Sequence, residues 1–125
     1  MTESPKPRIA LVGHCGPDSY ALRSAARRAV PEATVDFVTD EATAMQAAAA
    51  GALLLVNRVL DGDFNDDDGQ ALIKRLLETG AKRVMLISNF PDAQAAAERA
   101  GALPGFGKTT MGSEKTQQRL REALD

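Results

Sequence analysis

The chain has 125 residues, of which 15 are Lys or Arg and 17 are Asp or Glu, so its formal net charge at pH 7 is -2. This near balance, with four Phe, one Tyr and no Trp, disfavours a nucleic-acid partner, because such surfaces are basic and often carry aromatic rings. The single cysteine excludes an intramolecular disulfide. The polar N terminus lacks the apolar core of a signal peptide, and no apolar run approaches the roughly 20 residues of a membrane-spanning helix. We therefore expect a cytoplasmic protein with no membrane contact.

Alternating strands and helices predict a single α/β domain over residues 8–125, after a flexible N-terminal tail of residues 1–7. Strands are expected at 9–12, 52–57 and 83–88 from apolar runs, at 33–38 from an alternating pattern with Val35 and Phe37 on one side, and, from a weaker pattern, at 104–107. A helix is expected after each strand, and the predicted start and stop signals are Pro17, Thr39 or Asp40, Gly51, Gly80, Pro91, Gly101 and Ser113. Strands and helices that alternate five times predict one doubly wound sheet in a three-layer sandwich.

The central strand is the apolar run Leu53-Leu54-Leu55-Val56, which ends at Asn57. An apolar run without polar alternation is typical of a parallel strand that helices cover on both faces. Ligands of such sheets bind beyond the carboxyl ends of the strands. Asn57 is therefore the position whose chemistry matters most.

The order and spacing of these segments, from Arg8 to Leu124, resemble the receiver domain of the bacterial response-regulator family. Asn57 stands where the family has its phosphoacceptor aspartate, and Ser88 resembles the residue whose hydroxyl contacts the phosphoryl group. The pair Gly101-Ala102 followed by Lys108 resembles the family's last strand and its lysine. The resemblance implies a flavodoxin-like fold with a five-stranded parallel sheet in the order 2-1-3-4-5.

The same positions depart from the family in their chemistry. The acid pair that would hold Mg²⁺ is replaced by Gly13-His14, and the amide of Asn57 is not a nucleophile. Thr109 replaces a proline, and Gly105 stands at the conserved aromatic position. These departures predict a pseudo-receiver without phosphotransfer, enzymatic activity, metal or cofactor, in which Ser88 and Lys108 remain as half of an anion site.

A docking function is the first hypothesis. The predicted helix from Pro91, the strand with Phe106 and the last helix form the face that receivers use for dimerisation or partner binding. Phe106, Arg99 and Arg119 are the candidate contact residues, so the expected partner is another protein or a second copy of this chain. Small side chains in this region equally suit packing of the helices on their own sheet, and the sequence does not separate the two interpretations.

A second hypothesis is based on Cys15, which precedes a predicted helix and is adjacent to His14. A helix N terminus favours a thiolate, so Cys15 with His14, Ser88 and Lys108 could bind a small anion or support thiol chemistry. The loop loosely resembles the phosphocysteine loop of sugar phosphotransferase subunits. The alternative is a partly buried, inert cysteine beside a histidine with a satisfied ring. One His and one Cys are too few for a closed zinc site.

A third hypothesis is that displaced carboxylates of Asp18, Asp61 or Asp63 restore metal binding, and the last two lie in the acidic segment 61–68. The segment begins like a calcium loop but has Asp66 at the turn glycine and Leu72 at the closing glutamate. We expect instead that Asn65 caps the next helix and that Asp66, Asp67 and Asp68 occupy its first turn.

Overall fold

The structure is a computed structural model that describes residues 6–125. Residues 1–5, most of the expected tail, lie outside the described residues. The strands and helices, with one short 3-10 helix (η1), are β1 (Arg8–Val12), α1 (Gly16–Ala29), β2 (Thr34–Val38), α2 (Glu41–Ala49), β3 (Leu53–Asn57), α3 (Gly69–Glu78), β4 (Val84–Ile87), α4 (Pro91–Ala100), β5 (Leu103–Phe106), η1 (Lys108–Thr110) and α5 (Glu114–Leu124).

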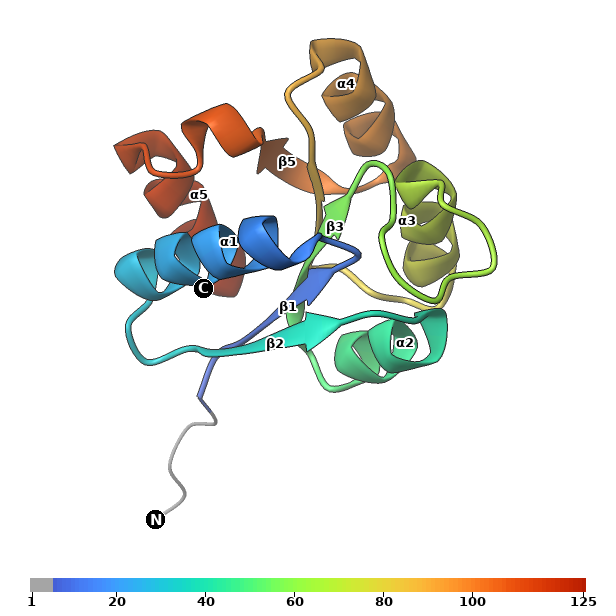
Figure 1. Cartoon of the computed structure of the whole chain (residues 1–125), viewed down its shortest axis with the longest axis horizontal. Helices are drawn as coiled ribbons and strands as arrows, with labels where there is room; N and C mark the ends of the chain where they lie inside the picture. Colours follow the sequence, from blue (N-terminus) through green and yellow to red (C-terminus); the bar gives the residue numbers. More distant parts are fainter. Residues whose placement is uncertain (1–5) are drawn as a thin grey trace.

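The sheet has the strand order β2-β1-β3-β4-β5, and every neighbouring pair is parallel. Helices α1 and α5 cover one face of the sheet, and α2, α3 and α4 cover the other (Figure 1). This confirms the predicted flavodoxin-like three-layer sandwich and its 2-1-3-4-5 order.

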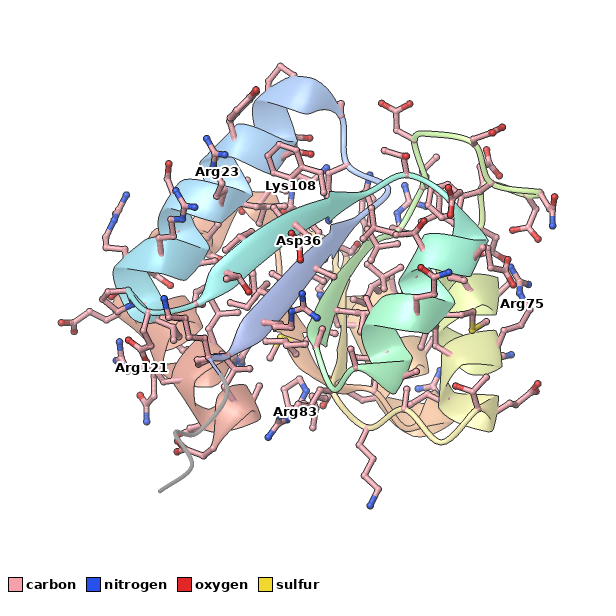
Figure 2. All side chains as sticks on the ribbon, turned by 90° about the horizontal axis from the view of Figure 1, so that it is seen from below. Arg23, Asp36, Arg75, Arg83, Lys108 and Arg121 are labelled. Carbon is pink, nitrogen blue, oxygen red and sulfur yellow. The ribbon has the colours of Figure 1, made fainter. Side chains whose placement is uncertain are left out.

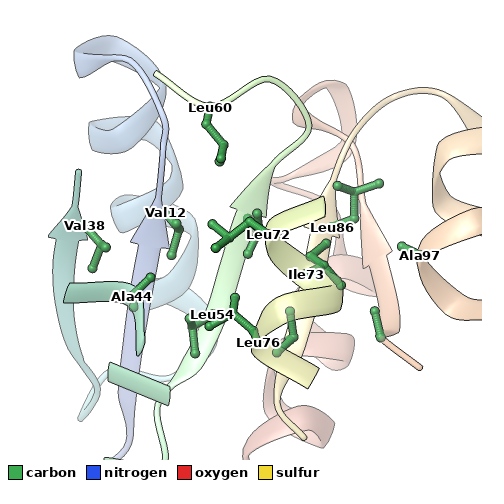
Figure 3. Close-up of a cluster of buried hydrophobic side chains, with 14 of the residues drawn as sticks. Val12, Val38, Ala44, Leu54, Leu60, Leu72, Ile73, Leu76, Leu86 and Ala97 are labelled. Atoms are coloured by element: carbon green, nitrogen blue, oxygen red, sulfur yellow. The ribbon is translucent and has the colours of Figure 1, made fainter. Parts of the chain in front are cut away.

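Two hydrophobic cores lie on opposite faces of the sheet, and β3 contributes to both. Leu54 and Val56 belong to the core beneath α2, α3 and α4 (Figure 3), whereas Leu53 and Leu55 belong to the core beneath α1 and α5. Because successive side chains of a strand point to opposite faces, an uninterrupted apolar run is required wherever both faces are covered. The four buried residues Leu53 to Val56 of β3 therefore hold Asn57 at the carboxyl end of the strand.

The helix ends show one wrong prediction. Asp40 caps α2 and Ser113 caps α5 as expected, by accepting hydrogen bonds from the backbone N–H groups of Thr43 and Thr116. Helix α3, however, begins at Gly69 and is capped by Asp68, so the expected cap at Asn65 is wrong and the three aspartates precede the helix.

The reason is the attachment of this acidic segment to the end of β3. Leu60 N–H donates to the Asp67 carbonyl, and Gly69 N–H donates to the Arg58 carbonyl, both at 2.8 Å. These two hydrogen bonds flank an antiparallel bridge between Val59 and Asp68, so the helix begins only at Gly69. A side chain at position 69 would not fit, because a Cβ there would lie 2.0 Å from the Asn57 carbonyl oxygen.

Charged side chains project from the helices and loops on the outside of the molecule (Figure 2). The edge strand β2 begins at Thr34, one residue later than expected, and its Phe37 is 42% exposed. Among the described residues, no helix is long and apolar enough to cross a membrane.

Candidate functional site

Three of the predicted site residues, Asn57, Ser88 and Lys108, line an open hollow of about 240 Å³ at the carboxyl end of the sheet, which we call the Asn57 hollow. Its lining residues come from the ends of β3 and β4, the loops that follow them, and the first residue of η1: Asn57, Arg58, Val59, Ile87, Ser88, Asn89, Phe90 and Lys108. The order of strands in the sheet brings Asn57, Ser88 and Lys108 together although up to 51 residues separate them (57 to 108).

Asn57 uses both hydrogens of its side-chain amide. Its Nδ2 donates to the Gly13 carbonyl at 3.0 Å and to the Val59 carbonyl at 2.7 Å. The amide therefore ties the loop after β1 to the loop after β3. A carboxylate can only accept hydrogen bonds, so an aspartate in this conformation would face two carbonyl oxygens without a donor.

Gly13 has no room for the acidic side chain that metal binding would need. Its φ of 75° is in the left-handed region, and a Cβ would lie 2.6 Å from the Leu60 Cδ2 atom. Its carbonyl also accepts a hydrogen bond from the Asp61 N–H at 2.8 Å. The loop after β1 is thus packed against the loop after β3, where a receiver would need space for carboxylates.

His14 is buried, and its Nε2 lies 2.8 Å from the Leu55 carbonyl oxygen. Since a carbonyl only accepts, Nε2 carries the proton, and the buried Nδ1 has no hydrogen-bond partner among the described residues. Burial lowers the pKa of the ring from 6.5 to about 4, against the opposing effect of the Leu55 hydrogen bond. His14 is therefore neutral at physiological pH and supplies no charge for an anion.

The burial of His14 predicts a loss of stability in mild acid. Between the folded pKa of about 4 and the unfolded value near 6.5, the unfolded chain binds more protons, so stability falls as the pH falls through this window. We expect the free energy of unfolding to drop by about 2 kcal/mol between pH 7 and pH 5. Urea titrations at both pH values measure this change. The variant His14→Gln, which keeps a side-chain donor but does not titrate, should lose much less, and equal losses in both proteins would contradict the account.

Lys108 is less available to bind an anion than the sequence suggests. Its Nζ lies 2.7 Å from the Asp18 carboxylate at the start of α1. The hydrogen bond from Lys108, followed by one from the Cys15 thiol, lowers the pKa of the Asp18 carboxyl. Asp18 thus neutralises the lysine that was expected to bind an anion, which the sequence did not reveal.

Ser88 is buried at the end of β4, and its Oγ accepts a hydrogen bond from the Phe90 N–H at 3.1 Å. Beside it, the Gln94 side chain joins β4 to β5, because its Nε2 lies within hydrogen-bond distance of the Leu86, Ser88 and Phe106 carbonyls (2.9, 3.1 and 3.2 Å). Sequence reasoning missed Gln94. The available signal was that Gln94 lies three residues before Ala97, so that both side chains are on the same face of the helix.

Gly105, at the family's aromatic position, makes room for Gln94. A Cβ on Gly105 would lie 2.0 Å from the Leu86 carbonyl oxygen and 2.9 Å from the Gln94 Oε1. The guanidinium of Arg119 donates to the Gly105 carbonyl from the opposite side. The Gln94 amide therefore links the last two strands at Gly105.

The three expected interface residues differ in their exposure to solvent. Phe106 is only 4% exposed and packs in the core beneath α1 and α5, so its predicted role as an interface anchor is wrong, because the side chain points into the protein. Arg99 is exposed on α4, and Arg119 is partly buried against β5.

The acidic carboxylates do not converge. Within residues 6–125, no group of three or more His, Cys, Asp or Glu side chains could hold a metal ion. Asp18 pairs with Lys108, and Asp66 faces Arg75 at 3.6 Å. Cys15 is partly buried at the N-cap of α1.

The strand order and the layers of the fold are those of solved receiver domains. Solved structures with this fold include the receiver domain of a DNA-binding response regulator from Colwellia psychrerythraea (TM-score 0.71, 14% identity, covering 93% of this chain and 96% of that chain). The non-phosphorylated receiver domain of the stress response regulator RcsB from Escherichia coli matches with a TM-score of 0.68 and 17% identity, over 98% of this chain and 97% of that one.

The receiver domain of the response regulator NarL from Mycobacterium tuberculosis is 21% identical, with a TM-score of 0.63 and coverage of 96% and 98% of the two chains. At such identities the likeness establishes the fold. No family model matches the sequence, and no curated protein matches it.

Proposed function

We propose that this chain is a signalling domain of the receiver type that has lost aspartate phosphorylation and acts by protein–protein interaction. The observation that carries the proposal is the amide of Asn57, which occupies the phosphoacceptor position and donates to the Gly13 and Val59 carbonyls. Reaction with a phosphodonor needs a carboxylate nucleophile and a divalent cation held by oxygen ligands. Asn57 and the tightly packed Gly13-His14 pair offer neither.

The proposed partner is another protein or a second copy of the chain, docked on α4, β5 and α5. Support comes from an open, largely apolar hollow of about 270 Å³ on this face, lined by Met85, Leu103, Pro104, Arg119, Glu122 and Ala123. Arg99 is exposed on the adjacent helix. The cytoplasmic location and the flexible N-terminal tail remain predictions.

A small-anion or thiol-dependent function has weaker support, because Lys108 pairs with Asp18 and Cys15 lies beside the same carboxylate. We therefore retain docking as the proposed function and assign no catalytic activity to the domain.

Thermal unfolding with and without Mg²⁺ and beryllofluoride tests the loss of phosphorylation. A ligand at a hundredfold excess over its dissociation constant stabilises a protein by about 2.7 kcal/mol, which is readily measured. We expect no change in melting temperature, since the site lacks the nucleophile and the metal ligands. A stabilisation that requires both Mg²⁺ and beryllofluoride would overturn the proposal.

Sedimentation velocity over a range of protein concentrations distinguishes the two kinds of partner. Self-association that Arg99→Glu weakens would identify a second copy on the α4–β5–α5 face, whereas a monomer at all concentrations would direct the search to a different protein.

A further inference from the structure

The most exposed large hydrophobic side chains of residues 6–125 gather in two clusters, each with one arginine. In the first cluster, the guanidinium carbon of Arg58 lies 4.8 Å from the centroid of the Phe90 ring, and Val59 follows Arg58 in the chain. Arg23 lies 5.0 Å from the Tyr20 ring and 5.5 Å from the Phe37 ring on the α1–β2 side. Arginine and aromatic residues are the side chains most enriched where proteins bind tightly to each other. Both clusters are therefore candidate contact surfaces.

Only in the Arg58 cluster does the arginine itself line a hollow. Arg58, Val59 and Phe90 line the Asn57 hollow, whereas Phe37 of the other cluster borders a hollow that also contains Asp36 and is lined by neither Tyr20 nor Arg23. Phe90 is 56% exposed and Val59 is 47% exposed, so the hollow has an apolar rim open to solvent. A side chain from a partner can enter it while a neighbouring side chain covers the rim.

The polar lining of the hollow is suited to a negatively charged group. It contains Arg58 and Lys108 but no carboxylate. Lys108 is neutralised by Asp18, whereas no carboxylate among the described residues lies within 4.0 Å of the Arg58 side-chain nitrogens. Arg58 therefore supplies the uncompensated positive charge, on a planar guanidinium that the Phe90 ring holds and that matches a carboxylate in shape.

The neutral groups of the hollow also include donors. Ser88 Oγ accepts from the Phe90 N–H, which leaves its hydroxyl hydrogen for a ligand. Asn89 Oδ1 accepts from the backbone and the hydroxyl of Thr109, which leaves its amide hydrogens available.

We propose that the Asn57 hollow binds the carboxylate of an Asp or Glu side chain of a partner protein, paired with Arg58, while an apolar neighbour of that acidic residue packs on Val59 and Phe90. The apolar rim favours an acidic residue within a peptide over a free, strongly hydrated phosphate. This inference rests on the proposed protein–protein interaction but not on the α4–β5–α5 face, and it assigns the vacated phosphorylation site to partner recognition.

A peptide array tests the proposal with the full chain. Each randomised peptide is presented in four versions that carry Glu, Asp, Gln or phosphoserine at one position. We expect binding of Glu or Asp versions with an adjacent apolar residue, and at least about tenfold weaker binding of the Gln versions. Arg58→Gln and Phe90→Ala should each weaken the same peptides by about tenfold or more, and Arg23→Gln, the matched control in the other cluster, should not.

Three results would overturn the inference: no peptide binding by the wild-type chain, equal binding of Glu and Gln versions, or a loss of binding with Arg23→Gln but not with Arg58→Gln. Exclusive binding of the phosphoserine versions would also contradict it. Arg58 and Phe90 are exposed and Arg23 is partly exposed, so all three variants should keep the wild-type unfolding transition and misfolding is recognised directly.

Treatment of the same preparation with acetyl phosphate and Mg²⁺ separates the two proposals. A negative array without a phosphoryl label defeats only the inference about the Asn57 hollow, whereas a label would defeat the loss of phosphorylation itself.

Discussion

Replacement of Asn57 by aspartate should destabilise the fold by about 2–4 kcal/mol at pH 7, although it restores the residue type of a phosphoacceptor. The Asn57 amide donates to the Gly13 and Val59 carbonyls, and a carboxylate would remove both donors and place negative charge next to two carbonyl oxygens. Urea unfolding followed by circular dichroism measures the change. A stability equal to that of the wild type would show that the two hydrogen bonds do not hold the loops.

The variant Asn57→Ala is the control, because it removes the hydrogen bonds without adding charge. It should lose about 1–2 kcal/mol, less than Asn57→Asp at pH 7. As the pH falls, the aspartate takes up a proton and regains one donor, so the difference between the two variants should shrink. A difference that is independent of pH would contradict the electrostatic part of the explanation.

Replacement of Gly105 by alanine should destabilise the protein by about 3 kcal/mol, a large effect for one methyl group. The added Cβ would lie 2.0 Å from the Leu86 carbonyl oxygen, which belongs to the backbone of the sheet, so β4 and β5 must separate. Such a separation also disturbs the Gln94 hydrogen bonds to both strands. The midpoint of urea unfolding measures the loss.

Gly16→Ala is the matched control, because Gly16 begins α1 and no heavy atom lies within 4 Å of a Cβ placed there. Its stability should change by less than about 0.5 kcal/mol. If both alanine variants are equally stable, the close approach at Gly105 does not constrain the sheet.

The features that could be predicted from the sequence depend on backbone pattern. An uninterrupted apolar run requires a strand covered on both faces, and Leu53 to Val56 are indeed buried. The carboxyl ends of parallel strands meet at one edge, which is why Asn57, Ser88 and Lys108 could be grouped in advance.

The features that could not be predicted depend on the direction of individual side chains. Lys108 is paired with Asp18 across 90 residues of sequence. The cap of α3 is Asp68 and not Asn65, because hydrogen bonds to the end of β3 delay the helix. Phe106 faces the core. Because successive side chains of a strand point to opposite faces, a shift of one residue in register reverses the direction of a side chain, and the pairing of β5 with β4 is irregular at this point.

The interaction of Arg58 with Phe90 joins two loops whose relative position follows only from the packed sheet. No local pattern distinguishes either residue from an ordinary exposed side chain. The candidate docking hollow therefore became visible only with the three-dimensional arrangement.

The most direct test of the central claim is the intact mass of the protein after incubation with acetyl phosphate and Mg²⁺, with a phosphorylatable receiver domain in the same experiment as a positive control. Our account predicts that the mass does not increase, because the nucleophile and metal ligands are absent from the Asn57 site. A stoichiometric phosphoryl group, mapped to Asp18, Asp61 or Asp63 and removed by hydroxylamine, would contradict it and show that a displaced carboxylate has replaced the lost aspartate.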